Sequence, residues 1–474
     1  MKTTLCDVFL FTFPGLLLIA LSACGGGGGG SAAVPANTAA AAYTVGGTVT
    51  GLVGGGLTLS NNSGYNLEVD ANGAFTMPAA LGAGDTYSVT INIQPNSPVQ
   101  TCTVSNGEGP VTGANITTVV VDCARFAFVA NSGSNNISAY LIDNTSGALT
   151  EVAGSPFATG ANPSAVTFDP SGQFVYVANA GSNNVSAYTI NTTTGALTAI
   201  ASSPFAAGAN PSVITFNSTS SGEFAYVANA GSDNVSAYAI NTATGALTAV
   251  AGSPFAAGTN PSVITFNTTS SGDFAYVANQ NSNDVSAYSV DATTGALTAI
   301  AGSPFAAGVN PSLVNFRANG TRFFAYVANQ NSNDVSAYSV DTTSGALTPI
   351  AGSPFAAGAN PSGIAFDYFG TEEFAYVVNT GSNNVSAYAV NTTTGAFTPI
   401  AGSPFATGTG PDGLSFDSSG DFAYLANHGA GSVSAFSINA TTGALMAVAG
   451  SPFATGANPY SVTLPIDSFN PWAY

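Results

Sequence analysis

A repeat of about 50 residues runs through most of this chain and constrains its fold more than any other feature. An apolar run such as FAYVAN ends in an asparagine at seven positions: Asn131, Asn179, Asn229, Asn279, Asn329, Asn379 and Asn427. Successive copies are 48 or 50 residues apart, and a second marker, Ser-Pro-Phe, recurs at the same intervals. Such a period is typical of architectures that stack one supersecondary unit against the next.

Each unit contains four short apolar runs that predict four β-strands. Between positions 210 and 253 these are SVITF, FAYVAN, VSAYAI and ALTAV, separated by Ser-Gly, Gly-Ser-Asp-Asn and Thr-Gly turn sequences. The link SPFAAGANP contains two prolines, so we expect it to cross between sheets instead of lying in a central strand. Seven such units predict an all-β, seven-bladed β-propeller, with an open solenoid as the alternative.

The two ends of the repeat region indicate how the ring closes. The region begins at a second strand, Phe126, and ends with a lone first strand over 461–466. We expect this last strand to complete the first blade by hydrogen bonds, because an unpaired edge would otherwise remain.

The motif FAYVAN and the sequence DPSGQFVYVAN at 169–179 resemble those of YVTN-type propellers and of the wider seven-bladed lactonase family. That family includes 6-phosphogluconolactonase-like and muconate-cyclase-like proteins, and the resemblance spans about 340 residues from Arg125 to Asp467. It implies the fold and, as one function, a lactonase-like hydrolase or cyclase. The family's enzymes depend on clusters of His, Arg and Glu, and this chain offers no matching set.

The N-terminus has the layout of an export signal. Lys2 precedes an apolar run over 8–21 that is short for a membrane span, which predicts a signal peptide over 1–23. The ending Leu-Ser-Ala-Cys resembles a bacterial lipobox and implies lipidation of Cys24, with an ordinary signal peptide as the alternative. Residues 24–42 then form a Gly/Ala-rich tether, and we expect anchoring of the protein to the bacterial outer membrane through this lipid.

Residues 43–123 predict a small β-sandwich-like spacer domain before the propeller at 124–467, and 468–474 form a C-terminal tail. The run TYSVTINI alternates with the period of two expected of a half-buried strand. In an exported chain Cys102 and Cys123 are expected to form a disulfide, with a metal site as the alternative.

The charge composition excludes several functions. Only 6% of the residues are charged, and 4 cations face 23 acids, for a net charge of −19. Nothing could neutralise the phosphates of a nucleic acid, so no nucleic-acid partner is expected. No cofactor or metal is expected either, because no phosphate-cradling loop or zinc spacing occurs and a calcium site would need more carboxylates per loop.

Two sets of residues are candidate sites. The seven asparagines that end the second strands could ring the channel mouth and bind an uncharged extracellular ligand such as a glycan; alternatively they cap strand ends and turns. In the last blade Gly-Pro-Asp412 replaces Asn-Pro-Ser, and His428 follows Asn427. A His–Asp pair can perform acid–base catalysis, although an exposed loop histidine is the alternative.

Two functions are compatible with these sequence features. Near-identical repeats supply the same group many times, whereas an active site needs unlike groups at one point. This favours a surface-anchored, non-catalytic propeller that binds a glycan or protein ligand or acts as a scaffold. The alternative is the lactonase-like enzyme, with His428 and Asp412 as its catalytic candidates. Arg317, Arg322, Tyr368, Glu372 and Glu373 are expected to be solvated turn residues on the opposite face.

Overall fold

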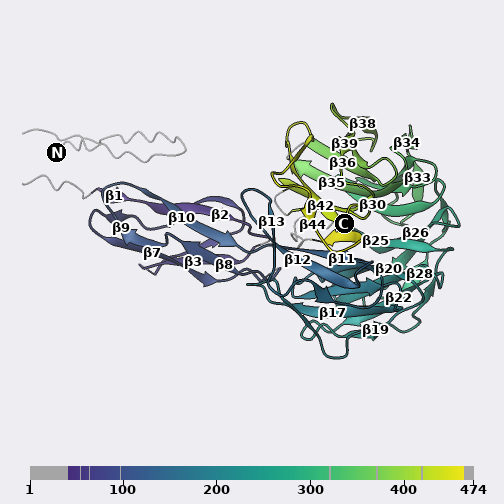
Figure 1. The fold of residues 1–474 in the computed structure, drawn as a ribbon, viewed down its shortest axis with the longest axis horizontal. Coiled ribbons are helices and arrows are strands. Elements are labelled where there is room, and N and C mark those ends of the chain that lie inside the picture. Colours follow the sequence, from purple (N-terminus) through teal and green to yellow (C-terminus); the bar gives the residue numbers. More distant parts are fainter. Residues whose placement is uncertain are drawn as a thin grey trace, which may run out of the picture. The chain divides into compact units, whose positions relative to one another are not determined.

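The computed structural model describes residues 41–463, apart from 54, 63, 97, 320–321, 370–371 and 418–419. The expected signal peptide, Cys24, most of the tether and the C-terminal tail lie outside the described residues. Every regular element in the described part of the chain is a β-strand (Figure 1). That part contains no helix with the length and hydropathy needed to cross a bilayer.

The first eighty residues of this part form two four-stranded sheets and one short strand pair. One sheet has the order β5 (Gly73–Thr76), β2 (Val45–Thr50), β10 (Ile116–Cys123), β8 (Cys102–Ser105). The other has the order β4 (Asn66–Val69), β3 (Leu57–Asn61), β7 (Thr86–Ile93), β9 (Glu108–Pro110). The separate pair is β1 (Ala42–Tyr43) with β6 (Leu81–Gly82).

These two sheets share one apolar core, as a β-sandwich does. Val49 and Val121 from one sheet and Leu59 and Val89 from the other are buried together. Strand β10 pairs with β2 in parallel and with β8 in antiparallel orientation. The second pairing places Cys123 opposite Cys102, and the two form the expected disulfide.

The remaining strands form seven sheets, which we number as blades 1 to 7. The innermost, first strands of blades 1 to 7 are β45 (Pro459–Thr463), β15 (Pro163–Phe168), β20 (Pro211–Thr219), β25 (Pro261–Thr269), β30 (Pro311–Asn319), β35 (Pro361–Phe369) and β40 (Pro411–Phe416). The second strands are β11 (Phe126–Asn131), β16 (Phe174–Asn179), β21 (Gly222–Asn229), β26 (Gly272–Asn279), β31 (Arg322–Asn329), β36 (Glu372–Asn379) and β41 (Phe422–Asn427).

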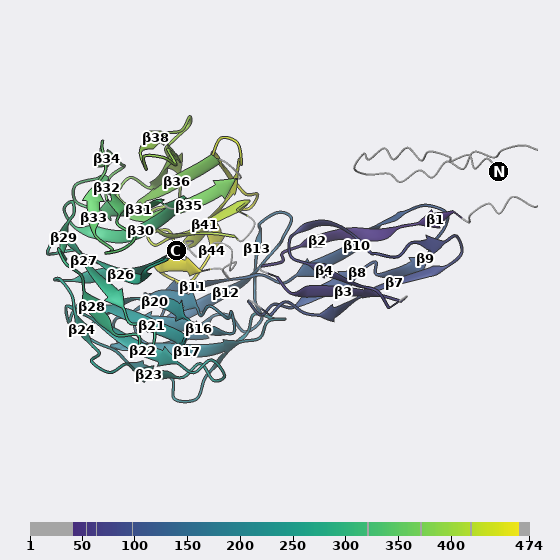
Figure 2. The same cartoon turned by 180° about the vertical axis from the view of Figure 1, so that it is seen from behind.

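The outer half of each blade is built in the same order. The third strands are β12 (Asn136–Ile142), β17 (Asn184–Ile190), β22 (Asn234–Ile240), β27 (Asp284–Val290), β32 (Asp334–Val340), β37 (Asn384–Val390) and β42 (Ser432–Ile438). The fourth strands are β13 (Leu149–Glu151), β18 (Leu197–Ala199), β23 (Leu247–Ala249), β28 (Leu297–Ala299), β33 (Leu347–Pro349), β38 (Phe397–Pro399) and β43 (Leu445–Ala447). Figure 1 shows β20, β25 and β30 near the propeller's centre and β28, β33 and β38 at its periphery, and Figure 2 shows β20 and β30 again from behind.

The Ser-Pro-Phe crossovers carry a feature that the sequence did not predict. A two-residue strand in each crossover pairs with the start of the third strand that precedes it in the chain. These short strands are β14 (Phe157–Ala158), β19 (Phe205–Ala206), β24 (Phe255–Ala256), β29 (Phe305–Ala306), β34 (Phe355–Ala356), β39 (Phe405–Ala406) and β44 (Phe453–Ala454).

The ring closes as expected. Strand β45 pairs with β11, so the end of the chain supplies the first strand of blade 1. The first strands of neighbouring blades contact one another in a closed series that includes β40 with β45 and β45 with β15. This geometry confirms the seven-bladed propeller. It excludes the open-solenoid alternative, because blades 7 and 1 are in contact and the ring has no open edge between them.

Buried tyrosines in blades 2 to 7 join each of these blades to the next, and blade 1 has Phe128 at this position. The Tyr276 hydroxyl of blade 4 donates to the Gly345 carbonyl of blade 5 at 2.7 Å. The corresponding bond to the next blade is made by Tyr176, Tyr226, Tyr326, Tyr376 and Tyr424. Tyr424 bonds to Gly147 of blade 1, so this contact also spans the closure. Each side chain therefore fills apolar space between blades and satisfies a buried carbonyl there.

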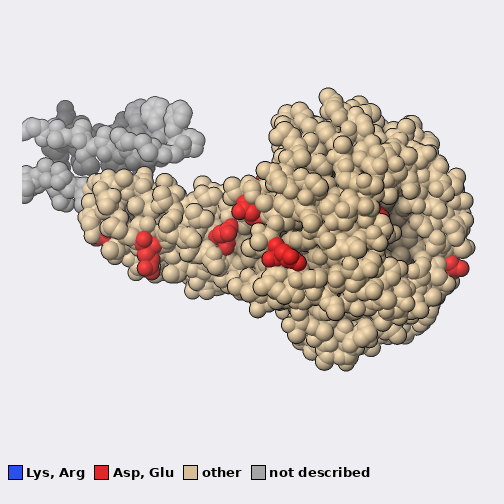
Figure 3. All heavy atoms as spheres, in the orientation of Figure 1, with Lys and Arg blue, Asp and Glu red and all other residues tan. Residues whose placement is uncertain are grey.

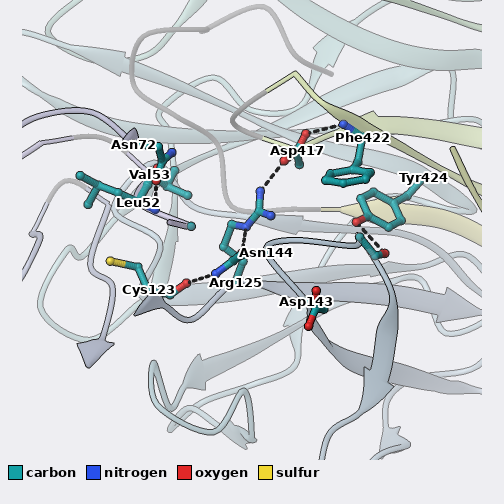
Figure 4. Close-up of polar contacts among 12 residues, drawn as sticks. Leu52, Val53, Asn72, Cys123, Arg125, Asp143, Asn144, Asp417, Phe422 and Tyr424 are labelled. Atoms are coloured by element: carbon teal, nitrogen blue, oxygen red, sulfur yellow. Dashed lines mark hydrogen bonds and ion pairs between the residues drawn. The ribbon is translucent and has the colours of Figure 1, made fainter. Parts of the chain in front are cut away.

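At the end of the channel where the first strands finish, two arginines form buried ion pairs. Arg125, just before β11, pairs with Asp417 of blade 7, and it also bonds to Asn144 (Figure 4). Arg317 of blade 5 pairs with Glu373 of blade 6, and the Arg317 guanidinium lies 4.9 Å from the centre of the Tyr368 ring. The expectation of solvated turn residues is therefore wrong for Arg317 and Glu373. Arg322, Glu372 and Tyr368 are exposed, as that expectation required.

Candidate functional site

A cavity of about 550 Å³ opens at the other end of the channel, where the first strands begin and the second strands end. Residues from all seven blades line it. Those that follow the first proline of each first strand are Ser164, Ser212, Ser262, Ser312, Ser362, Asp412 and Tyr460. Those that follow the last asparagine of each second strand are Ser132, Ala180, Ala230, Gln280, Gln330 and His428, and Thr380 lies at the same position in blade 6. Val213, Val263 and Leu313 contribute an apolar part.

The serines of this lining are used by the fold. Ser212 Oγ of blade 3 lies 3.1 Å from the Pro261 carbonyl oxygen of blade 4, and Ser312 Oγ of blade 5 lies 3.1 Å from that of Pro361 in blade 6. Each hydroxyl also contacts a carbonyl of its own blade, at Ala228 and Ala328. The serine positions therefore link neighbouring blades around the mouth and present little unused polarity to a ligand.

The seven asparagines proposed as a ligand-binding ring do not line this cavity. Asn131, Asn179, Asn229, Asn279, Asn329, Asn379 and Asn427 are each 0% exposed. In blade 3 the Asn229 amide donates to Asn234 Oδ1 and Ser236 Oγ, both at 2.9 Å, and its carbonyl accepts the Gly208 N–H at 3.1 Å. A Cβ on Gly208 would lie 2.6 Å from the amide carbon, so this glycine allows the crossover to pack on the asparagine. These amides hold the second hairpin and the crossover together, which is the capping alternative.

The asparagines before the prolines have a different role. Asn162, Asn210, Asn260, Asn310, Asn360 and Asn458 have φ between 51° and 60°, in the left-handed region that asparagine tolerates. In blades 2 to 6 the backbone N–H of this asparagine bonds to a side chain of the preceding blade, as Asn260 does to Asp233 Oδ1 at 2.8 Å. Gly410 takes this position in blade 7, with φ 62°. The sequence change at Gly410 thus preserves the turn and removes a side chain from the mouth.

The β-bulge in the first strand of blade 7 lies one residue later than in the other blades. In blade 3 the register shift falls between Pro211 and Val213, whereas in blade 7 it falls between Asp412 and Leu414. Asp412 is paired with Ala426, and Gly413 becomes the bulged residue, with φ 32°. A bulge that moves by one residue re-aims the neighbouring side chains. The half-buried Asp412 carboxylate is thereby held in the cavity lining.

Burial raises the pKa of Asp412 to about 6, although the Gly413 N–H and the Ser362 hydroxyl donate to it. In blades 3 and 5 the corresponding serine bonds to a proline carbonyl of the next blade. In blade 6 Thr380 makes this bond instead, with Thr380 Oγ1 2.6 Å from the Pro411 carbonyl oxygen. The Ser362 hydroxyl can therefore donate to Asp412. Thr380 Oγ1 is also 2.8 Å from Ser362 Oγ. Asp412 is therefore oriented by two blades and titrates close to neutral pH.

His428 and Tyr460 complete this corner of the mouth. Their rings meet edge to face, with centroids 5.8 Å apart and planes at 87°. His428 is half-buried, and its Nδ1 has no hydrogen-bond partner in the described part of the chain. The negative charge of Asp412 raises the pKa of the Tyr460 phenol, so it stays protonated. We call Asp412, His428 and Tyr460 the acidic corner.

The sequence pattern predicts that Asp412 and His428 lie on one face, and both residues line this cavity. The pattern missed Tyr460, Ser362, Thr380, Gln280 and Gln330. Tyr460 was detectable in principle, because it occupies the position of the repeated serine once 459–463 is aligned as a first strand. Ser362 carries no signal in the sequence, since it is identical to the repeat and differs only in its hydrogen bonds.

The family model described as Lactonase, 7-bladed beta-propeller matches residues 89–216, 204–316 and 365–457. The chain belongs to this lactonase family. The resemblance inferred from the strand motifs is thereby confirmed. No curated protein sequence matches the chain.

Solved structures share the fold of this lactonase-family propeller. A protein of Bacteroides uniformis designated a 6-phosphogluconolactonase superimposes with a TM-score of 0.61 at 18% identity, covering 72% of this chain and 99% of that one. The periplasmic gluconolactonase of Pseudomonas aeruginosa superimposes with a TM-score of 0.59 at 19% identity, with the same coverage. At these identities the likeness shows the fold alone. The family membership favours the enzymatic alternative over the non-catalytic display module.

Proposed function

We propose that this lactonase-family propeller hydrolyses uncharged lactones at the acidic corner of the channel mouth. One observation carries the proposal: three unlike polar groups, Asp412, His428 and Tyr460, lie together in one part of the cavity, whereas the other blades present internally bonded serines, small residues and, in blades 4 and 5, a glutamine. An acid–base site requires such unlike groups at one point.

In the proposed reaction the Asp412 carboxylate takes a proton from a water molecule, whose oxygen attacks the acyl carbon of the lactone. The acyl carbon–ring oxygen bond breaks, and neutral His428 relays to the ring oxygen the proton that Asp412 took from the water, which restores both residues. The protonated Tyr460 phenol donates a hydrogen bond to the developing oxyanion. A general base is most effective when its pKa is near the working pH, which suits the raised pKa of Asp412.

Variants that restore the sequence of other blades test this proposal without changing the fold. Asp412→Ser recreates the residue of blades 2 to 6, and His428→Ala that of blades 2 and 3. We expect Asp412→Ser to lower kcat/KM for δ-valerolactone and glucono-1,5-lactone by about 10²–10⁴-fold, measured as acid release after subtraction of the uncatalysed rate. His428→Ala is expected to lower it as well.

The matched control is Asp334→Asn, which restores the residue of blades 1, 2, 3 and 6 at a position that does not itself line the cavity. It should leave kcat/KM unchanged. Turnover that survives in both Asp412→Ser and His428→Ala, or that is absent from the wild type for all uncharged lactones, would contradict the proposal.

A further inference from the structure

The channel mouth carries a second polar group of side chains, away from the acidic corner. Gln280 of blade 4 and Gln330 of blade 5 line the cavity at the position where blades 2 and 3 have alanine. In the ring order, blade 4 is three blades from both blade 7 and blade 1. The two glutamines therefore belong to the side of the mouth that faces the acidic corner.

The fold uses little of the hydrogen-bonding capacity of these carboxamides. Gln280 Oε1 accepts a bond from Asn260 Nδ2 at 2.9 Å, which orients the amide and leaves its N–H groups unused. The Gln330 carboxamide has no hydrogen-bond partner among residues 41–463 as described. A carboxamide offers both donors and an acceptor, which is the combination that hydroxyl groups match.

The charged residues around the two glutamines restrict the charge of a ligand that can bind there. Among the described residues that line the cavity there is no Lys or Arg, and Asp412 contributes a carboxylate. Arg125 and Arg317 are occupied in ion pairs at the other end of the channel. On the face shown in Figure 3, the described residues form a mostly uncharged surface with scattered acidic side chains. A phosphate group would meet no compensating charge here.

Blades 4 and 5 also contribute apolar side chains to the cavity lining. Val263 and Leu313 line the cavity from the same two blades, 4 and 5. An apolar surface flanked by donors and acceptors suits a ring whose C–H groups alternate with hydroxyls.

We propose that Gln280 and Gln330 form a carboxamide subsite that binds the hydroxyl groups of an uncharged, polyhydroxylated substrate and so determines specificity. This inference rests on the proposed function, since the acidic corner would act on the acyl group while the subsite holds the hydroxylated part. The two glutamines touch the substrate away from the reacting atoms, so they act on its binding and not on the chemical step.

The test compares two lactones with the same ring size, one hydroxylated and one not. In the Gln280→Ala/Gln330→Ala variant we expect KM for glucono-1,5-lactone to rise about 10-fold, from the loss of two to three uncharged hydrogen bonds. KM for δ-valerolactone should change by less than about 2-fold. In the wild type, kcat/KM for 6-phosphoglucono-lactone should be at least about 100-fold below that for glucono-1,5-lactone. An equal change for the first two lactones, or no change for either, would overturn the subsite.

A binding measurement separates this inference from the proposed reaction. Calorimetry with gluconolactam, in which a ring N–H replaces the hydrolysable oxygen, reports affinity without turnover. The control variant Asn281→Gly/Asn331→Gly alters two exposed residues that also distinguish blades 4 and 5 from the rest, and it should bind like the wild type. If only the glutamine variant loses binding and no variant hydrolyses lactones, the subsite stands and the proposed reaction fails. If hydrolysis depends on Asp412 and the glutamine variant keeps its KM and affinity, the subsite fails and the reaction stands.

Discussion

Arg125 forms a buried ion pair with Asp417, although 292 residues separate them in the chain. The guanidinium enters blade 7 from the residue just before the second strand of blade 1, and both side chains are at most 4% exposed. This pair therefore joins the same two blades that strand β45 and the Tyr424–Gly147 hydrogen bond join. Closure of the ring rests on ionic, backbone and phenolic contacts together.

Breaking this ion pair should weaken the propeller. We expect Arg125→Met to lower the free energy of unfolding by about 3–5 kcal/mol, because it leaves the Asp417 carboxylate buried without the positive charge of the guanidinium. The Arg125→Met/Asp417→Asn double variant should lose less than the single one, since blades 3 and 4 carry asparagine at this position. Urea unfolding provides the measurement. Arg322→Met, at an exposed site, is the control, and an equal loss there would contradict the assignment.

The buried asparagines are expected to affect stability and not ligand binding. Asn229→Ala removes two donated hydrogen bonds and leaves the Gly208 N–H without its acceptor, so unfolding should become easier by about 2–3 kcal/mol. KM for any substrate or ligand should stay at the wild-type value, because Asn229 is 0% exposed. Thr242→Ala in the same blade, an exposed turn position, serves as the control. A stable Asn229→Ala protein with impaired ligand binding would restore the amide-ring hypothesis.

The activity should depend on pH through Asp412. Its carboxylate must be ionised to accept a proton, and burial raises its pKa to about 6. We therefore expect kcat/KM for δ-valerolactone to rise with pH, to reach half its maximum near pH 6, and to level off above it. The residual activity of Asp412→Ser should lack this step. A midpoint near pH 4, the usual range of a solvated aspartate, would show that another environment or another group controls the reaction.

Asp367 should make stability depend on pH. Burial, opposed by a bond from the Tyr368 N–H, raises its pKa to about 7, and Asp417 and Asp421 add to this rise. Between about pH 4 and pH 7 the folded protein thus binds a proton that the unfolded chain releases, so stability falls as pH increases across this window and is constant above it.

Asp367→Asn removes that proton uptake and recreates the residue of blades 3 and 4. At pH 8 the variant should be more stable than the wild type by on the order of 3 kcal/mol, and the difference should vanish near pH 4. Urea unfolding at several pH values measures it. Glu372→Gln, at an exposed site of the same blade, should follow the wild-type curve. A difference that stays constant with pH would exclude the titration of Asp367 as its cause.

Much of the propeller is determined by local sequence. Strand ends, turns and crossovers depend on contacts within a single unit of about 50 residues, so the repeat predicts the blade. The lone first strand at the end of the chain predicts closure, because an unpaired edge needs a partner. For the same reason Asp412 and His428 could be placed on one face: each follows a recognisable strand boundary.

Only the tertiary structure decided which side chains are available in the mouth. The asparagines look identical whether they face the channel or the hairpin, and burial in the blade decided that they bond internally. Ser362 differs from Ser312 because Thr380 takes over its bond to the next blade, a relationship across strands that no local pattern records. Tyr460, Asp412, Gln280 and Gln330 share a cavity because the ring closes, and ring closure brings together residues whose separation in the chain says nothing about their distance in space.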